Sequence, residues 1–232
     1  MESTHRVRLK DVIPMLLYFL LLPVAPFLAA GTIDWPAAWA YTVFTLVLLV
    51  LSRVLAARLD PGLIHERAHY YEHKDVQPWD KVLVPLVGQF GPLSVLVVAG
   101  LNRRFDWPPS IPALVQVIGG LMVVAGYAFS TWAMVVNRFF GAMVRIQSDR
   151  GHAVVTAGPY RFVRHPGYAG AIVAFFGIAL ALESAWALVP AALTSLLVIL
   201  RAGLEDRFLM QRLDGYYDYA ARVTYRLLPG VW

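Results

Sequence analysis

Four long apolar segments constrain this chain more than any other feature of its sequence. They run from Val12 to Ala30, Pro36 to Ala57, Val82 to Leu101 and Ile111 to Val136, and each is close to the roughly 20 residues that a helix needs to cross a bilayer. A backbone inside lipid must satisfy its own hydrogen bonds, so such segments fold as helices. With 59% hydrophobic and only 15% charged residues, the composition is that of an integral membrane protein.

Two shorter apolar segments follow, from Gly167 to Leu182 and from Ser184 to Leu200. They hold about 16 and 17 residues, less than a full span, and little more than Glu183 separates them. We therefore predict a tight helical hairpin and an all-α, polytopic membrane bundle of about six membrane helices. No internal repeat or Gly/Ser linker divides the sequence, so residues 1–232 are expected to form a single domain. The basic N-terminal stretch and its apolar run are predicted to be a retained anchor, not a signal peptide.

Basic residues are distributed unevenly around these segments. Three Lys or Arg residues lie in the N-terminal tail, and five lie in each of the segments 53–81, 138–164 and 201–232, so 18 of the 20 fall on one side. Arg103 and Arg104 fall on the other. By the positive-inside rule the richer side is cytoplasmic, and both termini are predicted to be inside. A basic rim that faces anionic lipid accounts for the net charge of +5 without any nucleic-acid partner.

Residues 158–170 read GPYRFVRHPGYAG and lie between two apolar stretches. Pro159 and Pro166 each remove a backbone donor and fix φ, while the glycines permit close backbone approach, so a shaped loop is expected here. Ionisable side chains this near a bilayer are costly, and they mark a candidate functional site. The absence of cysteine excludes disulfides, thiolate metal ligands and cysteine nucleophiles.

This loop belongs to a longer polar run, Asn137 to Gly170, and a second polar run closes the chain from Arg201. In order, the runs contain His-x-x-Val-Thr-x-Gly-x-Tyr, Arg-His-Pro-x-Tyr, Arg-x-x-x-Glu and Gly-Tyr-x-x-Tyr. This series resembles the isoprenylcysteine carboxyl methyltransferase family and, more loosely, the membrane phospholipid N-methyltransferases. The resemblance covers residues 137–232 and is specific, because several motifs recur in order and at matching spacing.

The resemblance implies a membrane methyltransferase that uses S-adenosylmethionine, bound at the cytoplasmic membrane surface by the two runs. Residues 1–136 would frame the path of a lipid-like or lipidated acceptor, and 137–232 would form the catalytic part; membrane lipids would be the other partners. Carried onto matching positions, the implied cofactor contacts are Gln147, His152, Ala153, Val154, Val155, Tyr160, His165, Pro166, Gly167, Tyr168 and Glu205. Arg201 would face the acceptor, and Arg201, Glu205 and His165 would be the catalytic residues.

The sequence departs from the family pattern in two places. The loop between Gln147 and His152 is about two residues shorter than the pattern, and the acidic pair is Glu205-Asp206 where two glutamates are usual. The first departure puts the role of Gln147 in question.

The residue types suit methyl transfer on physical grounds as well. Aromatic side chains such as Tyr160 and Tyr168 can wall an adenine ring, and Glu205 can hold amino or hydroxyl groups of the cofactor through charge-assisted hydrogen bonds. The planar guanidinium of Arg201 suits an anionic acceptor such as a prenylcysteine-type carboxylate. A phospholipid or other lipid amine is the alternative acceptor, and it needs a base, for which His165 and Glu205 are the candidates.

Simpler roles remain open for the same residues. Arg201 and Glu205 are four residues apart and can form an exposed ion pair on one helix face, and His165 can simply end a loop before Pro166. For Tyr216 and Tyr217 we favour the ordinary role of interfacial aromatic residues. The oligomeric state is left open by the sequence.

A different motif indicates a different class of enzyme. His65-Glu66-Arg67-Ala68-His69 fits H-E-x-x-H, with His73 one turn later, and could form the zinc site of a membrane metalloprotease. A polar juxtamembrane helix is the favoured interpretation, and no metal is expected. A membrane carrier is the third class of function that we considered. Intramembrane charges would support a carrier, but Arg53 is the single ionisable residue predicted to lie within a span.

Overall fold

The computed structural model describes residues 21–68, 73 and 75–232, and all regular structure in this part of the chain is helical. Four helices are long and apolar enough to cross a membrane: α2 (Pro36–Leu59), the continuous helix Asp80–Phe105, α6 (Ala113–Val136) and α8 (Leu188–Arg212). Asp80–Phe105 consists of α4 (Asp80–Pro85), a π-helical turn (Leu86–Phe90) and α5 (Gly91–Phe105). The π-turn follows Pro85, which cannot donate a regular helix hydrogen bond. The predicted all-α membrane class is confirmed.

The predicted number of six crossings stays a prediction, whereas the second helix of the predicted hairpin is longer than expected. Leu21–Ala30 is helical but short, and the first part of the predicted span from Val12 lies outside the described residues. α7 (Pro166–Ala181) has the expected 16 residues, but α8 has 25 residues and continues past Leu200 to Arg212. Hydropathy alone ended this helix too early, because its polar continuation is buried against other parts of the protein.

Glycines allow α6 and α7 to pack at very close range. A Cβ atom placed on Gly126 would lie 2.4 Å from the carbonyl oxygen of Gly170, and one placed on Gly119 would lie 2.5 Å from the backbone nitrogen of Ala181. Gly177 is equally crowded, with the carbonyl oxygen of Gly119 at 2.8 Å. Small residues at such positions let helix backbones approach within a membrane. This contact fixes α7, and with it the loop that precedes α7.

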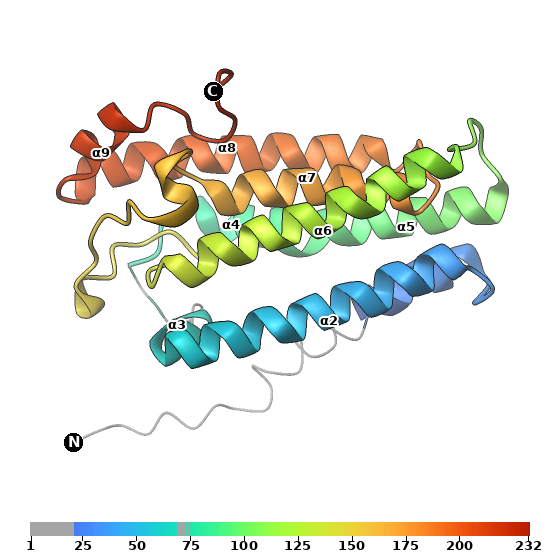
Figure 1. The fold of residues 1–232 in the computed structure, drawn as a ribbon, viewed down its shortest axis with the longest axis horizontal. Helices are drawn as coiled ribbons and strands as arrows, with labels where there is room; N and C mark the ends of the chain where they lie inside the picture. The colour runs from blue at the N-terminus through green and yellow to red at the C-terminus, as the bar shows by residue number, and fades with distance from the viewer. Residues whose placement is uncertain (1–20, 69–72, 74) are drawn as a thin grey trace.

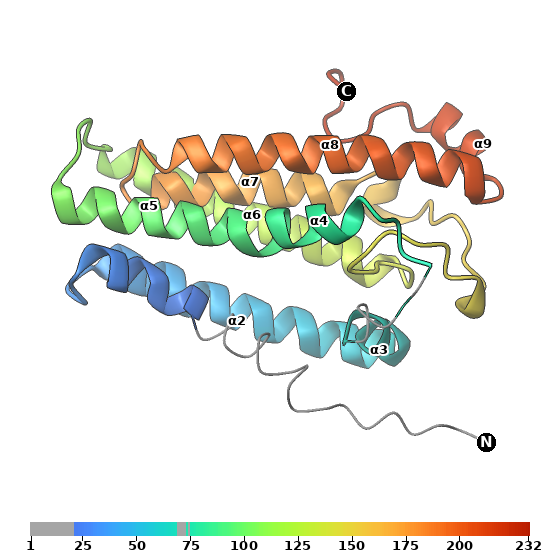
Figure 2. The ribbon, with the colours of Figure 1, turned by 180° about the vertical axis from the view of Figure 1, so that it is seen from behind.

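The helices lie side by side along the long axis of the molecule, with α2 on one flank (Figures 1 and 2). The short helices α3 (Pro61–Ala68) and α9 (Tyr216–Arg222) and the irregular segment 137–165 gather at one end, which we call the α9 end. The turns 31–35, 106–112 and 182–187 lie at the opposite end. The two polar runs of the sequence therefore meet at the same end of the bundle.

Candidate functional site

Arg201 lies at the middle of α8, and most of its donors are engaged in contacts within the protein. Its Nε donates to Asp80 Oδ1 at 2.6 Å, and its Nη2 donates to Asp80 Oδ2 at 2.9 Å and to the carbonyl oxygen of Ala142 at 3.0 Å. Its Nη1 donates to the hydroxyl of Tyr168. A guanidinium has five N–H donors, so these contacts leave one. The simpler alternative, an exposed ion pair with Glu205, is excluded, because Arg201 is only 7% exposed and its carboxylate partner is Asp80.

Asp80 is a central residue of this region, and no sequence motif indicated it as a site residue. It is fully buried at the start of α4, and its Oδ2 also accepts a hydrogen bond from the Val144 backbone N–H at 2.6 Å. Asp80 therefore connects α4, α8 and the irregular segment 137–165. The only sequence signal was a carboxylate placed directly before an apolar span, which resembles any loop residue.

Tyr168 joins Arg201 to Glu205 in the first turn of α7. The Tyr168 hydroxyl donates to Glu205 Oε2 at 2.5 Å, and the Arg201 guanidinium carbon lies 5.0 Å from the Tyr168 ring centroid. His165, the residue that precedes α7, stacks on the Tyr168 ring with a centroid distance of 5.6 Å and an interplanar angle of 10°. The implied catalytic residues Arg201, Glu205 and His165 therefore surround one tyrosine.

Asp206 is the anchor of the C-terminal segment. This fully buried carboxylate pairs with Arg164 at 2.8 Å and with Arg226 at 2.8 Å, accepts a hydrogen bond from the Tyr216 hydroxyl at 3.0 Å, and lies 3.4 Å from His165 Nε2. Four side chains from three parts of the chain thus converge on the residue where the family pattern has a second glutamate. We interpret Asp206 as the residue that holds the final segment on α8.

Two buried tyrosines, Tyr160 and Tyr216, lie close enough to Glu205 to feel its charge. Tyr160 is 7% exposed, its hydroxyl accepts a hydrogen bond from Asn137 Nδ2 at 3.0 Å, and its carbonyl oxygen accepts one from Tyr219 at 2.8 Å. Burial is the main cause that raises the pKa values of the Tyr160 and Tyr216 hydroxyls, and the nearby Glu205 charge raises both further. The predicted interfacial role is wrong for Tyr216, which is buried and hydrogen-bonded, whereas Tyr217 is 71% exposed.

Gln147 stabilises its own loop. It is 1% exposed, its Nε2 donates to the carbonyl oxygen of Phe139 at 2.9 Å, and its Oε1 accepts from Arg150 at 2.7 Å. The Gln147 backbone N–H donates to His152 Nδ1 at 3.2 Å, and the His152 ring lies 4.6 Å from the Phe139 ring. Burial, followed by the charges of Arg145 and Arg150, lowers the pKa of His152 to about 4. The NH₂ and the carbonyl oxygen of the Gln147 side chain therefore each have a hydrogen-bond partner within the protein.

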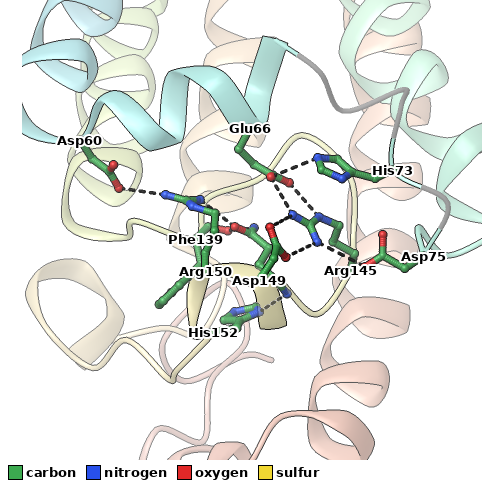
Figure 3. A network of polar contacts seen from close by, with 10 residues as sticks. Asp60, Glu66, His73, Asp75, Phe139, Arg145, Asp149, Arg150 and His152 are labelled. Carbon is green, nitrogen blue, oxygen red and sulfur yellow. Dashed lines mark hydrogen bonds and ion pairs between the residues drawn. The ribbon is translucent and has the colours of Figure 1, made fainter. Parts of the chain in front are cut away.

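A second ion-pair network lies beside this loop and is centred on Arg145 (Figure 3). Arg145 pairs with Glu66 of α3 at 2.7 Å, with Asp149 at 2.8 Å and with Asp75 at 3.2 Å, while His73 Nε2 lies 3.1 Å from Glu66. Burial alone would raise the pKa of Glu66, but the Arg145 contacts outweigh it and lower the pKa. The glutamate of the H-E-x-x-H motif thus holds α3 against the irregular segment.

Of the two histidines of that motif, His69 lies outside the described residues, and for His65 only the backbone, within α3, is described. Among the residues that the structure describes, no group of three or more His, Asp or Glu side chains could hold a metal ion.

The structure brings together four of the residues implied as cofactor contacts, Tyr160, His165, Tyr168 and Glu205. Pro166 and Gly167 begin α7 beside them, and Gly167 is tightly packed, since a Cβ there would lie 2.7 Å from the Phe140 ring. Val154 contacts the cluster of Leu213, Tyr216 and Tyr219, and Ala153 and Val155 flank it in the chain. Gln147 and His152 instead pack with Phe139.

A cavity of about 360 Å³ lies at the α9 end. It is lined by Asp75, Gln77, Ile146, Phe208, Gln211 and Arg212, and none of the residues implied as cofactor contacts lines it.

Comparison with known proteins agrees with this motif-based assignment. Residues 114–214 match the family model described as phospholipid methyltransferase. A probable protein-S-isoprenylcysteine O-methyltransferase of Oryza sativa subsp. indica is 29% identical over 122 residues, which cover 50% of this chain and 61% of the relative. Its counterpart in Oryza sativa subsp. japonica gives the same values. The chain thus spans less than two thirds of the length of these relatives. The resemblance expected from the motifs is confirmed, and a zinc protease gains no support.

Proposed function

We propose that this chain, which is similar to the isoprenylcysteine carboxyl and phospholipid methyltransferases, transfers a methyl group from S-adenosylmethionine to a lipid-like acceptor at the membrane surface. The observation that carries the proposal is the cluster of Tyr168, Arg201, Glu205 and His165. These side chains come from two family motifs that lie 33 or more residues apart in the sequence, and they meet at the end of the bundle where polar and apolar surroundings adjoin.

The residues present fit the proposed cofactor by their chemistry. Tyr160, His165 and Tyr168 offer aromatic surfaces for a purine ring, and Glu205 is a half-buried carboxylate that can accept hydrogen bonds from amino or ribose hydroxyl groups. When bound, S-adenosylmethionine supplies a methyl group on a positively charged sulfur. The role of the protein is to align the acceptor with this methyl group and to exclude water. Transfer removes the positive charge on sulfur, so surroundings of low polarity favour it.

The contacts of Arg201 bear on which acceptor is used. Four of its five donors are engaged, and Asp80 already occupies the planar fork that would grip a carboxylate. Around Tyr168 itself, two carboxylates, Asp80 and Glu205, surround the single guanidinium of Arg201. These contacts favour the second candidate acceptor, a lipid amine, over a prenylcysteine-type carboxylate. In that reaction Glu205 would take a proton from the ammonium group of the acceptor, which frees the nitrogen lone pair to receive the methyl group that the bound cofactor would supply, with S-adenosylhomocysteine as the leaving group.

Incubation of methyl-labelled S-adenosylmethionine with the purified protein and a membrane lipid extract tests both the methyl transfer and the choice of an amine acceptor. We expect a lipid whose label mild alkali does not release as volatile methanol, because an N–CH₃ bond is stable to alkali whereas a methyl ester is hydrolysed to methanol. Alkali-labile label would contradict the amine acceptor while supporting methyl transfer, and absence of any labelled lipid would contradict the methyltransferase itself. Glu205→Gln should lower turnover about a hundredfold or more. Glu183→Gln, at the opposite end of the bundle, is the matched control and should leave turnover unchanged.

The same proposal includes an orientation, with the α9 end on the cytoplasmic side. The support is the concentration of basic residues in the segments 53–81, 138–164 and 201–232. Because the chain has no cysteine, single cysteines can be introduced at Trp232 and Asp106 and probed with an impermeant thiol reagent in intact cells. Labelling is expected at Asp106 and not at Trp232, and the reverse pattern would contradict the orientation.

A further inference from the structure

Arg53 is a charged residue in an otherwise apolar part of α2. It lies six residues before Leu59, the end of the helix, which places its Cα about 9 Å inside that end at 1.5 Å per residue. Its neighbours Val50, Leu51 and Val54 are 61%, 49% and 41% exposed, as expected for side chains that face lipid. An ionisable residue at this depth is costly unless something pairs with it, and it is by default a candidate for function.

The side chain of Arg53 lies on the edge of the helix face that packs against the bundle. Ala56, one turn later, is 1% exposed, and Thr42, three turns earlier on nearly the same line, is 6% exposed. Arg53 itself is half buried. It therefore lies where α2 meets both the other helices and the surrounding lipid.

The partners of Arg53 distinguish it from the other buried arginines. Arg145, Arg150, Arg164 and Arg201 each pair with a carboxylate within 3.1 Å. For Arg53, no ion pair or hydrogen bond to the protein is present among the described residues. Burial within a span without a counter-ion leaves a desolvated charge, which is the least favourable arrangement for an ion in a protein.

We propose that Arg53 binds the phosphate of an anionic membrane glycerophospholipid held at the edge of α2. The anion available to a side chain in this position is a lipid phosphate, because the surrounding hydrocarbon excludes soluble anions. The planar guanidinium matches a phosphate through two parallel hydrogen bonds and remains charged at all relevant pH values. This site is separate from the cluster around Tyr168 and does not depend on the proposed methyl transfer.

Native mass spectrometry of the purified protein in detergent micelles that contain phosphatidylglycerol and phosphatidylcholine tests this site. The wild type is expected to retain one phosphatidylglycerol per chain, and Arg53→Gln should weaken its retention by about ten- to a hundredfold, the usual loss for a charged hydrogen bond. Arg58→Gln removes the same charge from an exposed position of the same helix and should behave as the wild type. Arg53→Lys should retain more lipid than Arg53→Gln, which separates loss of charge from loss of folding.

The same measurement distinguishes a lipid phosphate from free phosphate. Inorganic phosphate added at millimolar concentration should not displace the retained phosphatidylglycerol. Displacement would mean that the site opens to water, and equal retention by the wild type and Arg53→Gln would mean that Arg53 does not bind the lipid; either result overturns the proposal.

Discussion

Replacement of Asp80 by asparagine tests whether the Asp80–Arg201 pair holds the candidate site together. Asparagine keeps the size of aspartate but exchanges one carboxylate oxygen for an NH₂ group. In the native protein, Oδ1 accepts from Arg201 Nε, and Oδ2 accepts from both Arg201 Nη2 and the Val144 N–H. In either orientation of the amide, its NH₂ group therefore points at a donor. At least one hydrogen bond is lost, and Arg201 stays buried without a full negative charge.

The expected cost follows from this burial. Asp80 is fully buried and Arg201 is 7% exposed, and loss of one partner from a buried pair typically costs about 3–5 kcal/mol. For a protein of this length, 1 kcal/mol corresponds to about 2–4 °C in the unfolding temperature. Asp80→Asn should therefore lower that temperature by at least about 6 °C. Because Arg201 and Val144 would shift together, we expect methyl transfer to fall as well.

Thermal unfolding of the purified variants in one detergent checks this expectation. Asp75→Asn is the control, since Asp75 also pairs with an arginine but is 54% exposed, and exposed pairs contribute about 0–1 kcal/mol. A second comparison uses the pair of substitutions Asp80→Leu and Arg201→Met, which should be less harmful together than Asp80→Asn alone, because no buried charge is left over. An Asp80→Asn protein that unfolds within 2 °C of the wild type would refute the reasoning.

Four further outcomes are expected. Gly126→Ala should destabilise the protein by about 1–3 kcal/mol through overpacking against α7, whereas Gly120→Ala, where a Cβ would meet nothing within 4 Å, should be neutral or stabilising; thermal unfolding compares them. The pKa of His152 is lowered to about 4, so the unfolded chain takes up its proton first, and stability should fall as pH decreases from about 6.5 toward 4; His152→Asn should flatten the unfolding temperature in that window. Tyr216→Phe should cost about 1–3 kcal/mol by leaving a buried carboxylate short of a donor, while Tyr217→Phe should change nothing measurable. Chelators should leave methyl transfer unchanged, since the glutamate of the H-E-x-x-H motif is held in an ion pair; loss of labelled product on chelation would contradict this.

The sequence by itself determined the class of this protein and the region of its candidate site. Apolar segments of nearly fixed length define membrane helices because lipid cannot satisfy backbone hydrogen bonds, so α2, the continuous helix Asp80–Phe105 and α6 could be located within a few residues. The ordered motifs from His152 to Tyr219 indicated the resemblance to membrane methyltransferases, because several side chains at set spacing rarely recur by chance. The same motifs identified Tyr168, Arg201 and Glu205, which the structure brings into contact.

Tertiary structure alone decided what these side chains contact. Asp80 is 121 residues from Arg201, and Glu66 is 79 residues from Arg145, so no local pattern indicates either pair. The extent of α8 beyond Leu200 was likewise decided by burial of Arg201 and Asp206, whose charges end a span on any hydropathy scale. Hydropathy and motif spacing are local properties of the chain, whereas a buried charge is stabilised by whichever residue the fold brings within about 3 Å of it.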